Sequence, residues 1–375
     1  MNGMTSKERV LAALNHTEAD RVPLDIGSIN NTTMHHTVQT RFLQHLGLAG
    51  SGTEIRAVCQ GVVVPDDSIL DYFGADCRSV YINESRPWRD NGDGTFTDMW
   101  GLVQKLNPDG LYYNMVGHPL ENAETFEDID AYTFPELTPF MFEGLRERAL
   151  KYPDKFLVLE GFREPMFGLP SWLRRNENFY TDIAADEDLC NHLLDRILEF
   201  YKVFVDFIMA EVGDLVDIVK FADDLGSQQN LLLSPAAYRK IIKPHQAALY
   251  AYVREKYRKK ILLHSCGSIK PIIGDLIEIG VDALNPVQLS AKDMEPERLK
   301  AEFGKDITFW GGGIDTQSVL NKANPEEVKR QVKKNLGVFK PGGGYVFAQV
   351  HNIMPDVPVE NILAMYEAYR ENAAY

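Results

Sequence analysis

The sequence predicts an α/β protein whose core is a (β/α)8 TIM barrel, with a β-hairpin-rich insertion in the N-terminal third. Three observations support this fold class. From about residue 155 onward, short apolar segments alternate with long amphipathic ones, which is typical of parallel βα units. The length of 375 residues suits a barrel that forms one unit. Polar residues follow the predicted strands one after another, as in enzymes that place their chemistry at the carboxyl ends of barrel strands.

The first predicted elements are a helix and a strand. Thr5 and Glu8 have the spacing of a capping box, and an apolar stripe follows them. Residues 21–27 are predicted to form a strand that ends in a loop. Residues 60–120 have a different sequence pattern from the rest of the chain. Asn-Gly-Asp-Gly at 91–94 is flanked by aromatic and threonine residues, as in β-hairpins. We interpret this range as an insertion or cap over one end of the barrel.

Six further strands are predicted in the rest of the chain. They span residues 156–161, 217–222, 260–264, 283–287, 307–311 and 345–350. Helical segments lie between them, and residues 187–211 have the clearest apolar face. The strand at 21–27 and one more in the N-terminal third would complete a barrel of eight. No linker or internal repeat divides the chain, so we expect a single domain over residues 1–375.

Composition and charge argue against several classes of function. The net charge of −15, from 54 acidic and 39 basic residues, would repel a phosphate backbone, so we expect no nucleic-acid partner. The N-terminus lacks the apolar core of a signal peptide, and no stretch approaches the roughly 18 to 20 apolar residues of a membrane span. We therefore expect a cytoplasmic protein with no membrane partner. The 4 cysteines are too scattered for a disulfide framework and are expected to be thiols.

Polar side chains at successive strand ends are the candidates for catalysis and binding. In chain order they are Glu160 with Arg163, Asp223 with Asp224, His264 with Cys266, Asn285 with Gln288, Asp315, and His351 with Asn352. Because the carboxyl ends of parallel strands meet at one rim, we expect these side chains to surround one site. Four of them are predicted to bind substrate, namely Arg163, Asn285, Asp315 and Asn352.

His264 and Cys266 form the sharpest motif among these candidates. An imidazole and a thiolate two residues apart at a strand end can ligate one ion, and zinc suits this pair. A catalytic zinc site needs a third protein ligand and an open position, and His351, Glu160 or Asp223 could supply that ligand. A buried cysteine beside a histidine held by backbone carbonyls explains the motif equally well, so both interpretations remain open at this point.

The acidic strand ends allow acid/base chemistry. Asp223 and Asp224 are neighbours on an extended backbone, where side chains diverge, so only one should face the centre. We assign that place to Asp223 and expect Asp224 to cap a helix or to pair with an arginine. Glu160 ends an apolar strand, where its burial would be costly without a cation or a metal. A plain ion pair with Arg163 and a role in the site explain Glu160 equally well.

Several segments carry a wider resemblance. They are residues 6–14 with 21–23, Ala-Asp-Asp-Leu-Gly at 222–226, Trp-Gly-Gly-Gly-Ile-Asp at 310–315, and His-Asn-Ile-Met-Pro at 351–355 followed by Val-Pro-Val-Glu-Asn at 357–361. Over nearly the whole chain they resemble the uroporphyrinogen decarboxylase superfamily of barrels. That superfamily includes cobalamin-dependent methyltransferases of methanol, methylamine, chloromethane and aryl methyl ether pathways.

Two departures distinguish the subfamilies. Uroporphyrinogen decarboxylases carry an arginine-rich segment after the first strand, whereas residues 25–34 contain no arginine here, which disfavours tetrapyrrole decarboxylation. The methyltransferases use a His-x-Cys pair as zinc ligands, which His264 and Cys266 match. Their third ligand is often a cysteine where this chain has His351. The decarboxylases also have a histidine there, so His351 is predicted as a zinc ligand, a hydrogen-bonding group of the pocket or an acid/base.

The resemblance implies a methyltransferase with Zn²⁺ held by His264, Cys266 and His351, and with Asp223, Glu160 and His351 as catalytic groups. Such an enzyme would move a methyl group between a small substrate, for example a methoxylated aromatic, and a corrinoid protein or a thiol or folate acceptor. The corrinoid would be carried by a separate partner protein that docks on the rim. The alternative is a metal-free decarboxylase in which Asp223 stabilises a developing cation. The sequence leaves open whether the chain forms a homodimer.

Overall fold

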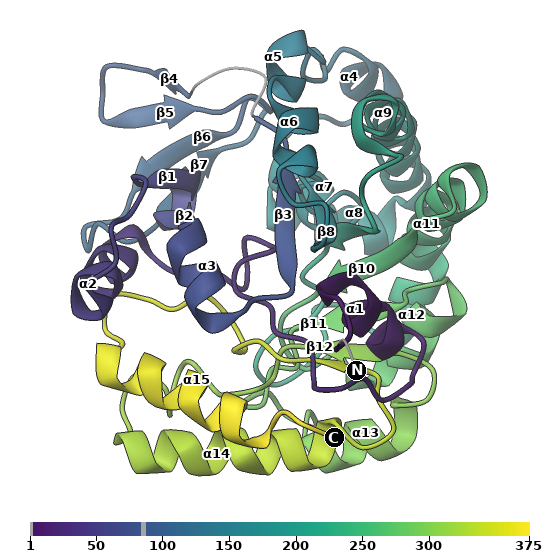
Figure 1. Cartoon of the computed structure of the whole chain (residues 1–375). Helices are drawn as coiled ribbons and strands as arrows, with labels where there is room; N and C mark the ends of the chain where they lie inside the picture. The colour runs from purple at the N-terminus through teal and green to yellow at the C-terminus, as the bar shows by residue number, and fades with distance from the viewer. Residues whose placement is uncertain (1–2, 84–87) are drawn as a thin grey trace.

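A parallel sheet of seven strands forms the centre of the computed structural model, which describes residues 3–83 and 88–375 (Figure 1). The spatial order is β13-β12-β11-β10-β9-β8-β3, so strands that follow one another in this series along the chain are also neighbours in space. The strands are β3 (Cys77–Tyr81), β8 (Phe156–Glu160), β9 (Ile218–Ala222), β10 (Lys260–His264), β11 (Ala283–Asn285), β12 (Thr308–Trp310) and β13 (Tyr345–Val346). The six strands predicted beyond residue 155 are confirmed. The last three are shorter than predicted; β11 ends before Pro286, which has no amide to donate to a ladder.

The predicted strand over residues 21–27 is wrong as a regular strand. Leu24 forms an isolated parallel bridge with Phe347 of the β13 side, and on the other side the Asp76 amide donates to the Leu24 carbonyl. Pro23 lacks an amide, so it cannot extend a ladder around this bridge. Over the described residues the architecture is therefore barrel-like, with seven regular strands and no eighth strand that closes the sheet.

Helices connect and cover the strands. They are α1 (Ser6–Leu14), α2 (His36–Leu46), α3 (Asp67–Phe73), α4 (Phe126–Asp130), α5 (Pro139–Phe142), α6 (Leu145–Leu150), α7 (Gly168–Arg174), α8 (Asn176–Ala185), α9 (Glu187–Val212), α10 (Pro235–Ala237), α11 (Lys243–Tyr257), α12 (Ile273–Glu278), α13 (Pro296–Phe303), α14 (Pro325–Phe339) and α15 (Val359–Asn372). The capping box of Thr5 and Glu8 and the long helix predicted over residues 187–211 are confirmed. Within the described part of the chain, no helix has the length and apolar character that crossing a bilayer requires.

Apolar side chains from the strands form a cluster inside the barrel. This cluster includes Phe156, Val158, Ile218, Leu262 and Trp310 from the strands. Three residues of α1 pack against it, namely Val10, Ala13 and Leu14. This cluster fills part of the interior, and the candidate polar side chains lie toward the carboxyl ends of the strands.

A separate antiparallel sheet lies at the upper left of Figure 1, in the order β4-β5-β6-β7. Its strands are β4 (Arg89–Asp90), β5 (Thr95–Thr97), β6 (Val103–Leu106) and β7 (Tyr113–Gly117). A shorter hairpin, β1 (Glu54–Ala57) with β2 (Val62–Val64), precedes it. The hairpins expected over residues 60–120 are thus present, but β3, inside that range, belongs to the parallel sheet. Residues 84–87 of the predicted insertion lie outside the described residues.

Candidate active site

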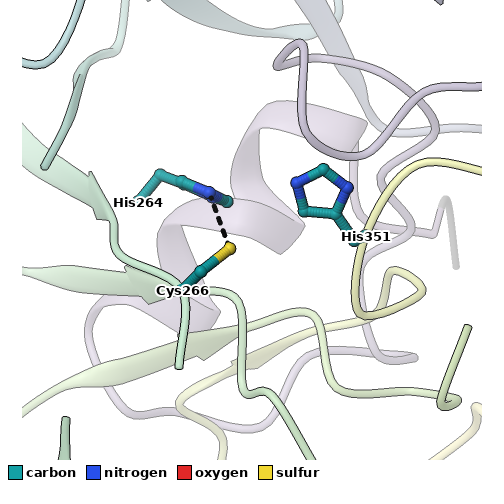
Figure 2. A group of neighbouring side chains, drawn as sticks. All are labelled: His264, Cys266 and His351. Carbon is teal, nitrogen blue, oxygen red and sulfur yellow. Dashed lines mark hydrogen bonds between the residues drawn. The ribbon is translucent and has the colours of Figure 1, made fainter. Parts of the chain in front are cut away.

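His264, Cys266 and His351 lie together beyond the carboxyl ends of the strands (Figure 2). His264 is the last residue of β10, Cys266 follows it, and His351 lies in the loop after β13. The candidate ligand atoms all lie within 4.8 Å of one another, and His264 Nε2 is 3.3 Å from Cys266 Sγ. Figure 2 shows His351 facing the other two side chains from a separate segment. The fold therefore assembles the three side chains that the sequence singled out.

Burial sets the protonation of these three groups. It lowers the pKa of His264 to about 3 and that of His351 to about 4, and the charge of Lys220 acts in the same direction on both. Both imidazoles are therefore neutral at pH 7 and have a lone pair to offer a metal. Burial also raises the pKa of the Cys266 thiol, so a bound cation is needed to favour the thiolate. One sulfur and two imidazole nitrogens are a donor set that zinc prefers, so these residues fit a zinc ion.

Asn285 fixes the orientation of His264. Its Nδ2 donates to the Trp310 carbonyl at 2.8 Å, which leaves its Oδ1 to accept from His264 Nδ1 at 2.6 Å. Since Nδ1 is then the protonated nitrogen, Nε2 is the acceptor and faces Cys266. Asn285 is fully buried and lies outside the pocket lining, so in this structure its side chain does not face the pocket. It acts through His264 instead.

A pocket of about 370 Å³ lies beside the metal-ligand candidates. His351 and Asp224 contribute to its wall and connect it to His264 and Cys266. Its remaining polar lining includes Arg56, Glu160, Arg163, Glu164 and Lys220. Aromatic side chains from the hairpins, the strand ends and helices α7 and α9 form much of the rest, namely Tyr81, Trp88, Trp100, Tyr112, Tyr113, Phe162, Trp172 and Phe204. These walls suit an aromatic ligand with a polar group at one end.

Glu160 is held by two cations at the polar end of this pocket. Lys220 Nζ is 3.0 Å from Glu160 Oε1, and the Arg56 guanidinium contacts Oε2. Arg163 pairs instead with Asp98, at 3.0 Å. The predicted ion pair of Glu160 with Arg163 is therefore wrong, because nearer cations neutralise the buried carboxylate.

Comparison with known proteins decides the family. The model of the family "Uroporphyrinogen decarboxylase (URO-D)" matches residues 113–372, which is more than half of the chain. The chain belongs to the uroporphyrinogen decarboxylase family. All the predicted site residues lie within the matched range, whereas Arg56 precedes it.

Individual members of the family are distant relatives. The uroporphyrinogen decarboxylase of Thermus thermophilus is 25% identical over 282 residues, which cover 73% of this chain and 74% of the relative. That of Coxiella burnetii is 23% identical over 265 residues and 68% of both chains. Among solved structures, a methyltransferase from Methanosarcina mazei superposes with a TM-score of 0.67 at 18% identity, over 98% of this chain and 99% of that one. At this identity the likeness establishes a shared fold.

The two adjacent aspartates of this family member point in the reverse of their predicted directions. Asp223 is fully buried and accepts hydrogen bonds from the amides of residues 166–168 and from Gln246 Nε2. Asp224 lines the pocket, and its Oδ1 accepts from the Cys266 amide at 2.8 Å. The side chains diverge as expected, but the free amides at the start of α7 require an acceptor and bind the first carboxylate. Asp223 therefore binds the start of α7, and Asp224 faces the pocket.

Asp223→Asn is expected to lower the free energy of unfolding by about 1–3 kcal/mol, because the amide NH2 would face backbone donors that need an acceptor. Urea denaturation measures this change. The matched control is Asp224→Asn, whose side chain is 42% exposed and whose unfolding free energy should stay within about 0.5 kcal/mol of the wild type. Equal stability of the two variants would contradict the assignment of Asp223.

Asp315 and Asn352 support loops and do not line the pocket. Asp315 Oδ1 accepts from the amides of Gln317 and Ser318, at 2.7 and 2.8 Å. Asn352 Oδ1 accepts from the amide of Thr33 at 3.1 Å. Each side chain is engaged by nearby backbone and does not face the pocket, and their contacts with substrate stay predictions. Of the predicted substrate-binding residues, only Arg163 lines the pocket.

Lys220 is the main site residue that the sequence analysis missed. It lies in the middle of β9, two residues after Ile218, whose side chain packs inside the barrel. The period of two in a strand therefore turns Lys220 inward as well. A charged residue within an otherwise apolar buried strand was the available signal, since a lysine is almost never fully buried unless it is paired.

The support that Asn285 gives to His264 predicts an effect on metal affinity. Asn285→Ala should weaken zinc binding about 10- to 100-fold, because His264 loses the partner that fixes its tautomer and orientation. Competition with a chelator of known affinity measures this loss. The control is Asn335→Ala, which removes a buried asparagine that bonds the carbonyls of Gly312 and Gly313. Wild-type zinc affinity in Asn285→Ala would refute the role.

Proposed function

We propose that this protein is a zinc-dependent methyltransferase. It moves a methyl group between a small methoxylated aromatic compound and a corrinoid protein, or a thiol or folate acceptor. The observation that carries the proposal is the convergence of His264, Cys266 and His351 beside a pocket with aromatic walls. The resemblance to methyltransferases with a His-x-Cys zinc pair and the shared fold of the Methanosarcina mazei methyltransferase support it.

Zinc held by His264, Cys266 and His351 would act as a Lewis acid that polarises an ether oxygen, or would keep a thiolate acceptor nucleophilic. Other residues of the chain position these ligands and line the pocket. Asn285 orients His264, and Asp224 holds the Cys266 amide. The aromatic walls bind the ring and exclude water, while Arg163 contributes a polar contact from the strand end. Glu160 balances part of the positive charge of Lys220 and Arg56.

The partner in this proposal is a separate protein that carries the corrinoid and docks transiently at the mouth of the pocket. We propose that the chain acts as one domain in the cytoplasm. The sequence relatives favour a second candidate, a metal-free decarboxylase, because those relatives are named uroporphyrinogen decarboxylase. The absence of arginine from residues 25–34 weighs against a polycarboxylate substrate of that kind.

An assay with free cobalamin distinguishes the two candidates. Zinc-loaded protein is mixed with methoxylated aromatics and chemically reduced cobalamin, and the absorbance of methylcobalamin is followed. We expect methylcobalamin to form with at least one aromatic ether, and chelation of zinc to stop the reaction. Release of carbon dioxide from uroporphyrinogen by the chelated protein, without methyl transfer, would refute the methyltransferase.

A further inference from the structure

Lys220 and Arg56 place an excess of positive charge at the polar end of the pocket. Both cations contact Glu160, and no side chain of the three is more than 7% exposed. Lys220 Nζ also lies 3.0 Å from the amide oxygens of Asn30 and Asn31, which are neutral. Among the residues that the structure describes, these two buried cations share one contacting carboxylate. A buried charge without a full counter-charge is costly, so an additional anion is favoured here.

The pKa of Lys220 shows the cost of burying its charge beside a second cation. Burial and the neighbouring Arg56 lower the pKa of Lys220 to about 7. Two other acidic side chains line the pocket and act in the opposite direction on the pKa of Lys220, but their hydrogen bonds run to backbone and not to the lysine. Asp224 accepts from the Cys266 amide, and Glu164 accepts from the Asp224 amide. An anionic ligand that reaches Lys220 would restore the balance.

Asn31 connects this cation to the candidate metal centre. Its Oδ1 is 3.0 Å from Lys220 Nζ, and its Nδ2 lies 3.5 Å from His351 Nε2. Lys220 and His351 both line the pocket. A negatively charged oxygen bound beside His351 would therefore lie close to Lys220, where it could take the place of the neutral amide oxygens.

The walls of the pocket favour an anionic aromatic ligand over a cationic one. The guanidinium groups of Arg56 and Arg148 lie 5.2 and 4.6 Å from the centre of the Tyr81 ring. That of Arg163 lies 5.2 Å from the centre of the Trp172 ring. These rings already bind cations, so they are poorly suited to form a cage for a quaternary ammonium group.

We propose that Lys220, supported by Arg56, forms an oxyanion-binding site for the ionised hydroxyl group of a phenol. The inference rests on the proposed function. When the electron pair of a cobalt(I) corrinoid attacks the methyl carbon of an aryl methyl ether, a cobalt–carbon bond forms and the carbon–oxygen bond breaks. The electron pair of the broken bond stays on the ring oxygen, so the product is a phenolate. The ammonium group of Lys220 compensates this charge as it develops.

The test uses 4-nitrophenol, whose ionised form absorbs visible light, and the full chain freed of zinc. We expect the pKa of the bound nitrophenol to fall by about one unit, a tenfold shift toward the phenolate. Lys220→Met should abolish most of this shift, and Lys220→Arg should retain it. The control is Lys300→Met, which removes a partly buried lysine that contacts the Gly343 carbonyl and does not line the pocket. This variant should keep the full shift.

An unshifted pKa in the wild type, or an equal shift in folded Lys220→Met, would overturn the inference. If circular dichroism shows that Lys220→Met is unfolded, the wild-type affinities for 4-nitrophenol and 4-nitroanisole decide. Tenfold tighter binding of the phenolate supports the site, and equal affinities overturn it. The assay needs neither zinc nor a methyl acceptor. A shifted pKa in a protein that transfers no methyl group would therefore refute the proposed function while the oxyanion site stands.

Discussion

Cys266→Ala is expected to reduce bound zinc from about one ion per chain to less than one tenth. The variant removes the only thiolate of the three candidate ligands, and two neutral imidazoles hold zinc far more weakly than a set that includes a sulfur. The loss should also abolish methyl transfer. Elemental analysis after dialysis against a weak chelator measures the zinc content.

Cys190→Ala is the matched control for this prediction. Cys190 is buried in α9, far along the chain from the candidate ligands, and its substitution should leave about one zinc per chain. Full zinc occupancy in Cys266→Ala would show that other residues hold the metal.

Glu160→Gln is expected to lower the free energy of unfolding by about 3–5 kcal/mol. The substitution leaves the buried side chains of Lys220 and Arg56 without their shared counter-charge, and breaking a buried ion pair from one side is strongly destabilising. Urea denaturation followed by circular dichroism measures the change. Adding Lys220→Met to this variant should recover part of the loss, because one of the uncompensated cations is removed.

An exposed ion pair provides the comparison for Glu160→Gln. Asp214 pairs with Arg146 at 2.8 Å, and their side chains are 60% and 44% exposed. Asp214→Asn should therefore leave the free energy of unfolding close to that of the wild type, because solvent screens an exposed ion pair. A similarly small loss in Glu160→Gln would contradict the account of two buried cations that depend on one carboxylate.

The strands of the core could be predicted from the sequence because each is a short apolar run between helical segments. Such a run has few other ways to bury its side chains. The segment at 21–27 has the same apolar character, but Pro23 prevents a ladder, and only the packed structure shows that a single bridge remains. The hairpins were predicted from their turn residues, while the place of β3 in the parallel sheet depends on pairing with the distant β8.

The candidate metal centre could be predicted because the chemistry of its residues is distinctive and strand ends converge. The sequence did not predict which side chains face the pocket where that depends on the direction of the side chain. Asp223 and Asp224 are identical in type, and the free amides of α7 determine which one turns away from the pocket. Lys220 and Arg56 were missed for a related reason: one is an inward-facing strand residue, and the other reaches the site from an N-terminal hairpin.

X-ray absorption at the zinc edge, combined with metal analysis of protein from zinc-supplemented cells, tests the central claim most directly. The account predicts about one zinc per chain, with one sulfur ligand from Cys266 and two nitrogen ligands from His264 and His351. A protein that binds no zinc under these conditions, or that binds zinc without a sulfur ligand, would contradict it.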